Sequence, residues 1–76
     1  MKRELQNPLI LTHLRNKQTR SRGLSQMEAL GLYQVWRLAS RIEELREDHV
    51  IRTEMRVDRL GRRYARYFYV KPKGNK

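Results

Sequence analysis

The 76-residue sequence contains no cysteine, which is the first limit on what the chain can be. Without thiols it forms neither a disulfide framework nor a thiolate zinc site, and a reducing cytoplasm is the compartment that fits best. The longest apolar run near the N-terminus, residues 8–11, is too short for a signal-peptide core and far shorter than the roughly 20 residues of a membrane span. The composition therefore predicts a soluble cytoplasmic protein without membrane attachment.

Acidic residues are also scarce, with 8 Asp and Glu against 18 Lys and Arg and a formal net charge of +10. The positive charge lies at both ends of the chain. Residues 1–24 hold six basic residues and one acidic residue, residues 50–76 hold nine and two, and residues 25–49 hold three and five. Such a distribution favours a polyanion as partner, bound through the two basic flanks.

Groups that perform catalysis or bind metals are sparse. His13 and His49 stand alone, with no carboxylate at the spacing of metal ligands around them. The sequence has no Ser-His-Asp order and no glycine-rich phosphate loop. We therefore expect a binding protein, with no enzymatic activity, no metal and no cofactor.

The first predicted element is a helix over residues 8–16. Asn7 is a favoured helix cap, and Pro8 suits the first turn because its missing N–H is not needed there. Residues 1–7 are expected to form a flexible basic lead, and Ile10, Leu11 and Leu14 to face the core. Residues 17–23 are polar and predict a loop.

Two more helices follow in the acidic middle of the chain. Ser25 and Glu28 have the spacing of a capping box, which predicts a short second helix. Its buried side is expected to hold Met27, Ala29 and Leu30. A turn over residues 31–34 and an amphipathic third helix over residues 34–48 complete this part. The residues of that helix expected in the core are Val35, Leu38, Ala39, Ile42 and Leu45.

Beyond His49 the apolar period changes from 3.6 to 2, which predicts a β-hairpin. Ile51, Thr53, Met55 and Val57 alternate with charged residues, and residues 64–70 are rich in aromatic and β-branched residues. Turn-forming residues at 58–62 include Gly61. Residues 71–76 are expected to be a disordered basic tail.

Three helices followed by one hairpin predict an α+β fold, the winged helix-turn-helix, as a single domain over residues 8–70. In this fold the third helix enters the major groove and the hairpin, the wing, lies against the backbone or minor groove. Tyr64, Tyr67, Phe68 and Tyr69 alternate with arginines, which fits either packing of the wing on the core or a stacking platform for single-stranded nucleic acid. We favour packing.

Three separated blocks resemble a family of short phage helix-turn-helix proteins. They are Ser-Gln-Met-Glu-Ala-Leu at 25–30, Val-Trp-Arg-Leu-Ala-Ser-Arg-Ile-Glu-Glu-Leu-Arg at 35–46, and Arg-Arg-Tyr-Ala-Arg-Tyr at 62–67. The resemblance extends over residues 9–70. It implies a phage-encoded DNA-binding or transcription-regulating role, carried here by Arg37, Ser40 and Arg41.

The candidate interface with double-stranded DNA has two parts. Base reading is assigned to the third helix and its entry, because arginine can bond guanine with two parallel hydrogen bonds; the residues are Gln34, Arg37, Ser40 and Arg41. Phosphate contacts are assigned to the loop, the wing and the tail; these residues are Lys17, Arg20, Arg22, Arg59, Arg62, Arg63 and Lys71.

An alternative function is direct binding to host RNA polymerase, in a host–virus interaction that alters transcription. Acidic residues crowd the end of the third helix, where a phosphate backbone would repel them. The surface for such a protein partner would comprise Trp36, Glu43, Glu44, Glu47 and Asp48. Trp36 has a second interpretation, as a cover for the core or the wing, which we favour. A homodimer on DNA also fits a domain of this size.

Overall fold

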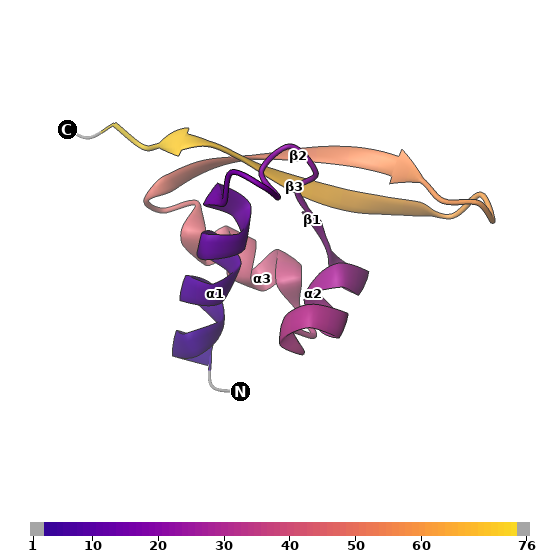
Figure 1. Cartoon of the computed structure of the whole chain (residues 1–76), viewed down its shortest axis with the longest axis horizontal. Coiled ribbons are helices and arrows are strands. Elements are labelled where there is room, and N and C mark those ends of the chain that lie inside the picture. The colour runs from indigo at the N-terminus through magenta and orange to yellow at the C-terminus, as the bar shows by residue number, and fades with distance from the viewer. Residues whose placement is uncertain (1–2, 75–76) are drawn as a thin grey trace.

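The computed structural model describes residues 3–74. Three helices lie on one side of a three-stranded antiparallel sheet in the order β1-β3-β2 (Figure 1). The elements are α1 (Arg3–Arg15), β1 (Leu24–Ser25), α2 (Gln26–Tyr33), α3 (Leu38–Leu45), β2 (His49–Val57) and β3 (Arg63–Pro72). The predicted order of three helices and a hairpin is confirmed, and the short strand β1 is an addition.

The core lies between the three helices and the proximal half of the hairpin. Leu38 and Ile42 of α3 are at most 1% exposed, and Ile51 and Tyr69 of the sheet close the core from above. Burial of each such aliphatic side chain stabilises the fold by about 1.5–3 kcal/mol. The predicted core positions Ile10, Leu14, Val35, Leu38, Ile42 and Leu45 are confirmed as buried.

Helix α1 begins at Arg3, so the predicted start at Pro8 is wrong, and residues 3–7 are not a lead but extend the helix by about one and a half turns. Pro8 lies inside the helix, where its ring removes one backbone hydrogen bond. The residues before it are good helix formers. Asn7 then ties this extension to the body, because its Nδ2 donates to Glu44 Oε1 at 2.9 Å. Residues 1 and 2 of the predicted lead lie outside the described residues.

The capping box at the start of α2 is confirmed. Ser25 Oγ accepts from the Glu28 amide at 3.4 Å, while Glu28 Oε1 accepts from the Ser25 amide at 3.1 Å. The expected burial of Met27 is wrong, because this side chain is 77% exposed, whereas Ala29 is buried. Met27 therefore lies on the outer side of this short helix.

The turn between α2 and α3 is shifted from its predicted place. Helix α2 continues through Gly31, and Gln34 forms the turn in the left-handed conformation with φ of 58°. Gln26 holds the turn from a distance, because its Nε2 donates to the Val35 carbonyl at 2.6 Å and its Oε1 accepts from the Leu38 amide at 2.7 Å. The first free amide of α3 is thereby satisfied without a local cap.

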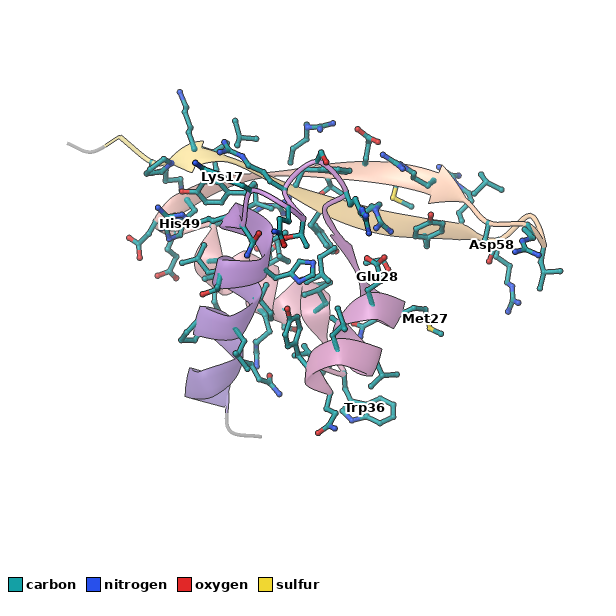
Figure 2. The ribbon with its side chains drawn as sticks, viewed as in Figure 1. Lys17, Met27, Glu28, Trp36, His49 and Asp58 are labelled. Carbon is teal, nitrogen blue, oxygen red and sulfur yellow. The ribbon has the colours of Figure 1, made fainter. Side chains whose placement is uncertain are left out.

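Helix α3 is consequently shorter than predicted, covering residues 38–45 instead of 34–48. Val35 is buried in the turn and not in a helix. Ala39, expected in the core, is exposed. Trp36, expected to cover the core or wing, is 75% exposed and stands in the turn beside the end of α2 (Figure 2).

The hairpin runs far beyond the helices and gives the molecule its long dimension of 43 Å (Figure 1). Its predicted alternation produces burial only near the root, at Ile51 and Phe68 to Tyr69. Met55 and Val57 are more than half exposed because no helix lies beneath them. The favoured packing of the aromatic residues on the core is confirmed for Tyr69, which is 7% exposed and belongs to the core cluster. Phe68 is 6% exposed but is buried on the other face of the strand, outside that cluster.

The predicted tail also begins too early. Strand β3 continues to Pro72, which pairs with His49, and the Lys73 amide donates to the Asp48 carbonyl at 3.0 Å. The strand can end at Pro72 because proline has no N–H to offer the ladder. Residues 75–76 lie outside the described residues.

Candidate nucleic-acid interface

The outward side of α3 is less basic than the sequence indicated. Because Leu38, Ile42 and Leu45 face the core, the helical period places Ala39, Glu43 and Glu47 outward. Ser40 lies half-buried between these sides. Arg37 is exposed at the N-cap and makes no capping bond through its side chain. The exposed cation of this helix therefore stands at its N-terminal end, and the acidic residues lie toward its C-terminal end.

Arg41 was expected on the exposed face of α3, but the structure places it half-buried. Its side chain is 13% exposed, and its Nη2 donates to Glu44 Oε2 at 3.2 Å. The other oxygen of Glu44 accepts from Asn7 of α1. Arg41 thus helps to join α3 to α1 through Glu44. A single helical period could not predict this, because the position of α1 comes from tertiary packing.

Gln34, the remaining base-reading candidate, is exposed in the turn. Its backbone amide donates to the carbonyls of Ala29 and Leu30, which fixes the main chain and leaves the side chain outward. The turn and the first residues of α3 therefore present Gln34, Trp36 and Arg37 together at one end of the helix.

The wing tip is an ordered turn with three exposed arginines, Arg59, Arg62 and Arg63. Asp58 organises it, because Oδ1 accepts from the amides of Leu60 and Arg62, both at 2.9 Å. Gly61 adopts φ of 81° and donates to the Asp58 carbonyl at 3.0 Å. Arg62 lies 3.7 Å from Asp58, a contact too exposed to offset much of its charge. The guanidinium groups of the tip are therefore available to phosphates.

The predicted phosphate contacts in the loop and strand divide into two groups. Lys17, Arg22 and Lys71 are exposed. Arg20 is partly engaged in the fold, because its Nη2 donates to the Val70 carbonyl at 3.1 Å and its guanidinium lies 5.8 Å from the centre of the Tyr69 ring.

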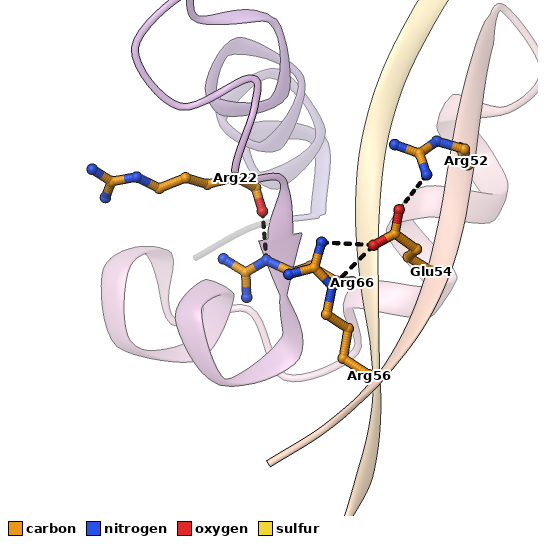
Figure 3. Close-up of polar contacts among 5 residues, drawn as sticks. All are labelled: Arg22, Arg52, Glu54, Arg56 and Arg66. Carbon is orange, nitrogen blue, oxygen red and sulfur yellow. Dashed lines mark hydrogen bonds and ion pairs between the residues drawn. The ribbon is translucent and has the colours of Figure 1, made fainter. Parts of the chain in front are cut away.

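A cluster that the sequence analysis did not single out occupies the face of the hairpin opposite the helices. Glu54 accepts hydrogen bonds from Arg52 and from Arg56, the latter at 2.6 Å from Nη2 (Figure 3). The hydrogen bonds from Arg56 and Arg52 hold the pKa of Glu54 below its usual value. The signal was present in the sequence, because charges at 52, 54 and 56 share one face of a strand.

Arg66 connects β3 to α2. Its Nε donates to the Arg22 carbonyl (Figure 3). Its Nη2 donates to Glu28 Oε2 at 2.8 Å. Burial raises the pKa of Glu28, but the hydrogen bonds from Arg66 and Ser25 outweigh it, so the pKa is lowered. Arg66 therefore holds the wing against the start of α2.

Most of the candidate protein-partner residues are exposed to solvent. Trp36 is 75% exposed, and Glu43, Glu47 and Asp48 are exposed. Glu44 differs, because it is half-buried and bonded to Arg41 and Asn7.

Both histidines lie next to tyrosines. His13 Nδ1 is 2.7 Å from the Tyr33 hydroxyl, and His49 Nδ1 is 3.1 Å from that of Tyr69. Within residues 3–74 no three His, Asp or Glu side chains gather as metal ligands do. In the same part of the chain no helix has both the length and the apolar character needed to cross a bilayer.

Comparison with known proteins gives one match. A family model described as a winged helix-turn-helix domain matches residues 5–72, nearly the whole chain. Neither a curated protein nor a solved structure matches significantly.

Proposed function

The chain belongs to the winged helix-turn-helix family, and on that premise we propose that it is a small phage-encoded regulator of transcription that binds double-stranded DNA. The observation that supports this most is the pairing, on this fold, of an exposed α3 N-terminus with three unburied arginines at the wing tip. The phage origin, and with it action in a bacterial cytoplasm, rests on the resemblance of the three sequence blocks alone.

The distribution of charge sets the direction of approach. The N-terminal end of α3 carries Arg37 and the positive end of the helix dipole, both of which favour phosphate and base acceptors. Glu43 and Glu47 face outward toward the other end and would be repelled by the backbone. The helix therefore enters the major groove by its first turn, with Gln34, Arg37 and Ser40 nearest the bases.

The wing then supplies most of the electrostatic affinity. Arg59, Arg62 and Arg63 lie on a turn held by Asp58, so they reach a backbone or a narrow minor groove with little loss of backbone entropy. Arg41 was expected to read bases. We assign it instead the role of a positioning residue, which holds α3 against α1 through Glu44.

Selection from a random duplex library tests this proposal. The native chain is expected to enrich a motif, and Arg37→Ala to lose preference at one or two base pairs, since a bidentate arginine–guanine contact discriminates by about 1–3 kcal/mol. Arg59→Ala is the matched control with the same charge change. It is expected to weaken binding to all sequences alike and to keep the motif. Binding without any enriched motif would contradict sequence-specific regulation.

A second candidate function, binding to RNA polymerase, is favoured by the exposure of Trp36, since tryptophan is enriched in interface hot spots. Glu43 and Glu47, toward the other end of α3, add exposed acidic residues that DNA would avoid. Trp36→Ala should then abolish capture of purified polymerase in the absence of DNA. Equal capture by the variant and the native chain would eliminate this candidate.

A further inference from the structure

The face of the hairpin opposite the helices carries a second, separate group of arginines. In the β2–β3 register Arg52 pairs with Phe68, and the next residues in sequence, Ile51 and Tyr69, pair with each other and point into the core. Arg52 and Phe68 therefore point away from the helices. We call Arg52, Glu54, Arg56 and Phe68 the outer-face cluster.

The two arginines of this cluster are held in place. Their guanidinium carbons lie 4.6 Å and 5.5 Å from the centre of the Phe68 ring, and Glu54 accepts from both (Figure 3). Phe68 is only 6% exposed, whereas the side chains of Arg52 and Arg56 are 53% and 44% exposed. The aromatic ring and the carboxylate thus orient two arginines that remain open to solvent.

Both guanidinium groups keep donors for a ligand. Each has five N–H bonds. Arg52 directs Nη1 to Glu54, and Arg56 directs Nε and Nη2 there. The remaining N–H groups suit the paired oxygens of a phosphodiester, which arginine binds in bidentate fashion.

The charge of this surface fits the same ligand. Arg52 and Arg56 outnumber Glu54, so the cluster carries a net positive charge. A net positive surface of this kind attracts nucleic-acid backbone without reading sequence.

The duplex bound by α3 cannot also cover this face. The helices and the outer-face cluster lie on opposite sides of the sheet, in a molecule 26 Å by 22 Å across its shorter axes. A single duplex would have to bend around that body. Duplex DNA is stiff on this scale, because its persistence length is about 150 base pairs. The partner of the outer face is therefore a different duplex.

We propose that the outer-face cluster binds the phosphate backbone of a second DNA duplex, so that one chain bridges two duplexes. This inference rests on the proposed function, because α3 and the wing tip must hold the first duplex.

A two-duplex capture assay at low salt tests the proposal. A biotinylated duplex is fixed on beads, the full chain is added, and capture of a fluorescent second duplex is measured beside the affinity for the first. The native chain is expected to capture the second duplex. Arg52→Gln/Arg56→Gln should reduce capture at least about fivefold and change the affinity for one duplex less than about twofold.

Two further variants separate bridging from general loss of charge or fold. Arg59→Gln/Arg62→Gln makes the same change in charge at the wing tip and should weaken binding of the first duplex instead. Glu54→Gln removes the one carboxylate of the cluster and should raise capture, an effect that unfolding could not produce.

The outcomes are distinct. Binding of the first duplex without capture of the second, or equal capture by the native chain and Arg52→Gln/Arg56→Gln, overturns bridging and leaves the proposed function intact. Failure to bind the first duplex overturns both. Reduced capture with Arg52→Gln/Arg56→Gln together with increased capture with Glu54→Gln establishes the outer face as the second contact.

Discussion

Gly23 joins the polar loop to β1 at a point where no other residue fits. Its φ is 70°, a conformation that L residues rarely adopt. A Cβ atom there would lie 2.4 Å from the Tyr67 carbonyl oxygen and 2.9 Å from the Phe68 ring. The close approach of the loop to β3 therefore depends on the absence of a side chain.

Gly23→Ala is expected to destabilise the chain by about 2–4 kcal/mol, because it adds both a strained φ and a clash with backbone. Gly31→Ala is the matched control. Gly31 lies inside α2 with open space around it, so alanine should stabilise by about 0.5–1 kcal/mol. Urea unfolding measures both changes, and a neutral Gly23→Ala would show that the loop can move away.

The Glu28–Arg66 contact should make the stability of the folded chain depend on pH. The pKa of Glu28 is lowered in the folded chain from 4.5, because the hydrogen bonds from Arg66 and Ser25 outweigh the effect of burial. Its contribution to stability is therefore complete above about 4.5 and is lost as the pH falls through the lower, folded value. Glu28→Gln should be less stable than the native chain at pH 7, and the gap should narrow toward pH 3.

The control for that experiment is the same substitution in an Arg66→Gln background. There the pH-dependent part of the gap should shrink, because the main hydrogen-bond donor is gone. A gap that stays constant from pH 7 to pH 3 in the native background would contradict the assigned contact.

Features that depend only on neighbours in the chain could be predicted from the sequence. The Ser25–Glu28 capping box and the Asp58–Gly61 turn were predicted because both are local. Arg41 was placed on the exposed face, but its partner Glu44 is itself bonded to Asn7 of α1, a contact that requires α1 and α3 to be packed. The role of a charged residue on a half-buried helix face is decided by the element packed against it.

Among the helices, the ends were less predictable than the inward faces. Apolar spacing placed Leu38, Ile42 and Leu45 correctly, whereas α3 begins at residue 38 because Gln26 supplies its first hydrogen bond from α2. A contact between residues 12 apart leaves no periodic signal. Gly31 was expected to end α2, because glycine is unfavourable inside helices, but α2 continues through it to Tyr33.

Because the arginines of the wing tip are exposed, they should contribute to the salt dependence of DNA binding. If Arg59, Arg62 and Arg63 each neutralise a phosphate, Arg59→Gln/Arg62→Gln/Arg63→Gln should lower the slope of log affinity against log salt by about 2.7. Affinity titrations with one duplex at several salt concentrations measure this. Arg52→Gln/Arg56→Gln should leave the slope for a single duplex unchanged, and an unchanged slope in the triple variant would mean that the tip touches no backbone.

The whole molecule consists of a packed body and a hairpin that extends beyond it (Figure 1). Alternation alone predicted two faces for the hairpin but not where the helices stop covering it. Ile51 is buried, while Met55 and Val57 on the same side of the sheet are exposed. That boundary is a property of the assembled fold.

Hydrogen exchange should reveal this boundary. Amides near the Met55–Ala65 and Val57–Arg63 pairs are expected to exchange at least about tenfold faster than those near the Ile51–Tyr69 pair. The reason is that the distal pairs open without disturbing the core. Equal protection along the hairpin would show that the tip unfolds only with the body.

The hairpin is fastened at its base by the bond from the Lys73 amide to the Asp48 carbonyl and at its middle by Arg66. Among the described residues no hydrogen bond joins residues 55–65 to a helix. Mechanically it is a cantilever. Five residues of overhang reach about 16 Å, so a 10° tilt at the root moves the tip by about 3 Å. A slight flexing of the sheet is therefore enough to carry the terminal arginines from one phosphate position toward another while α3 stays seated.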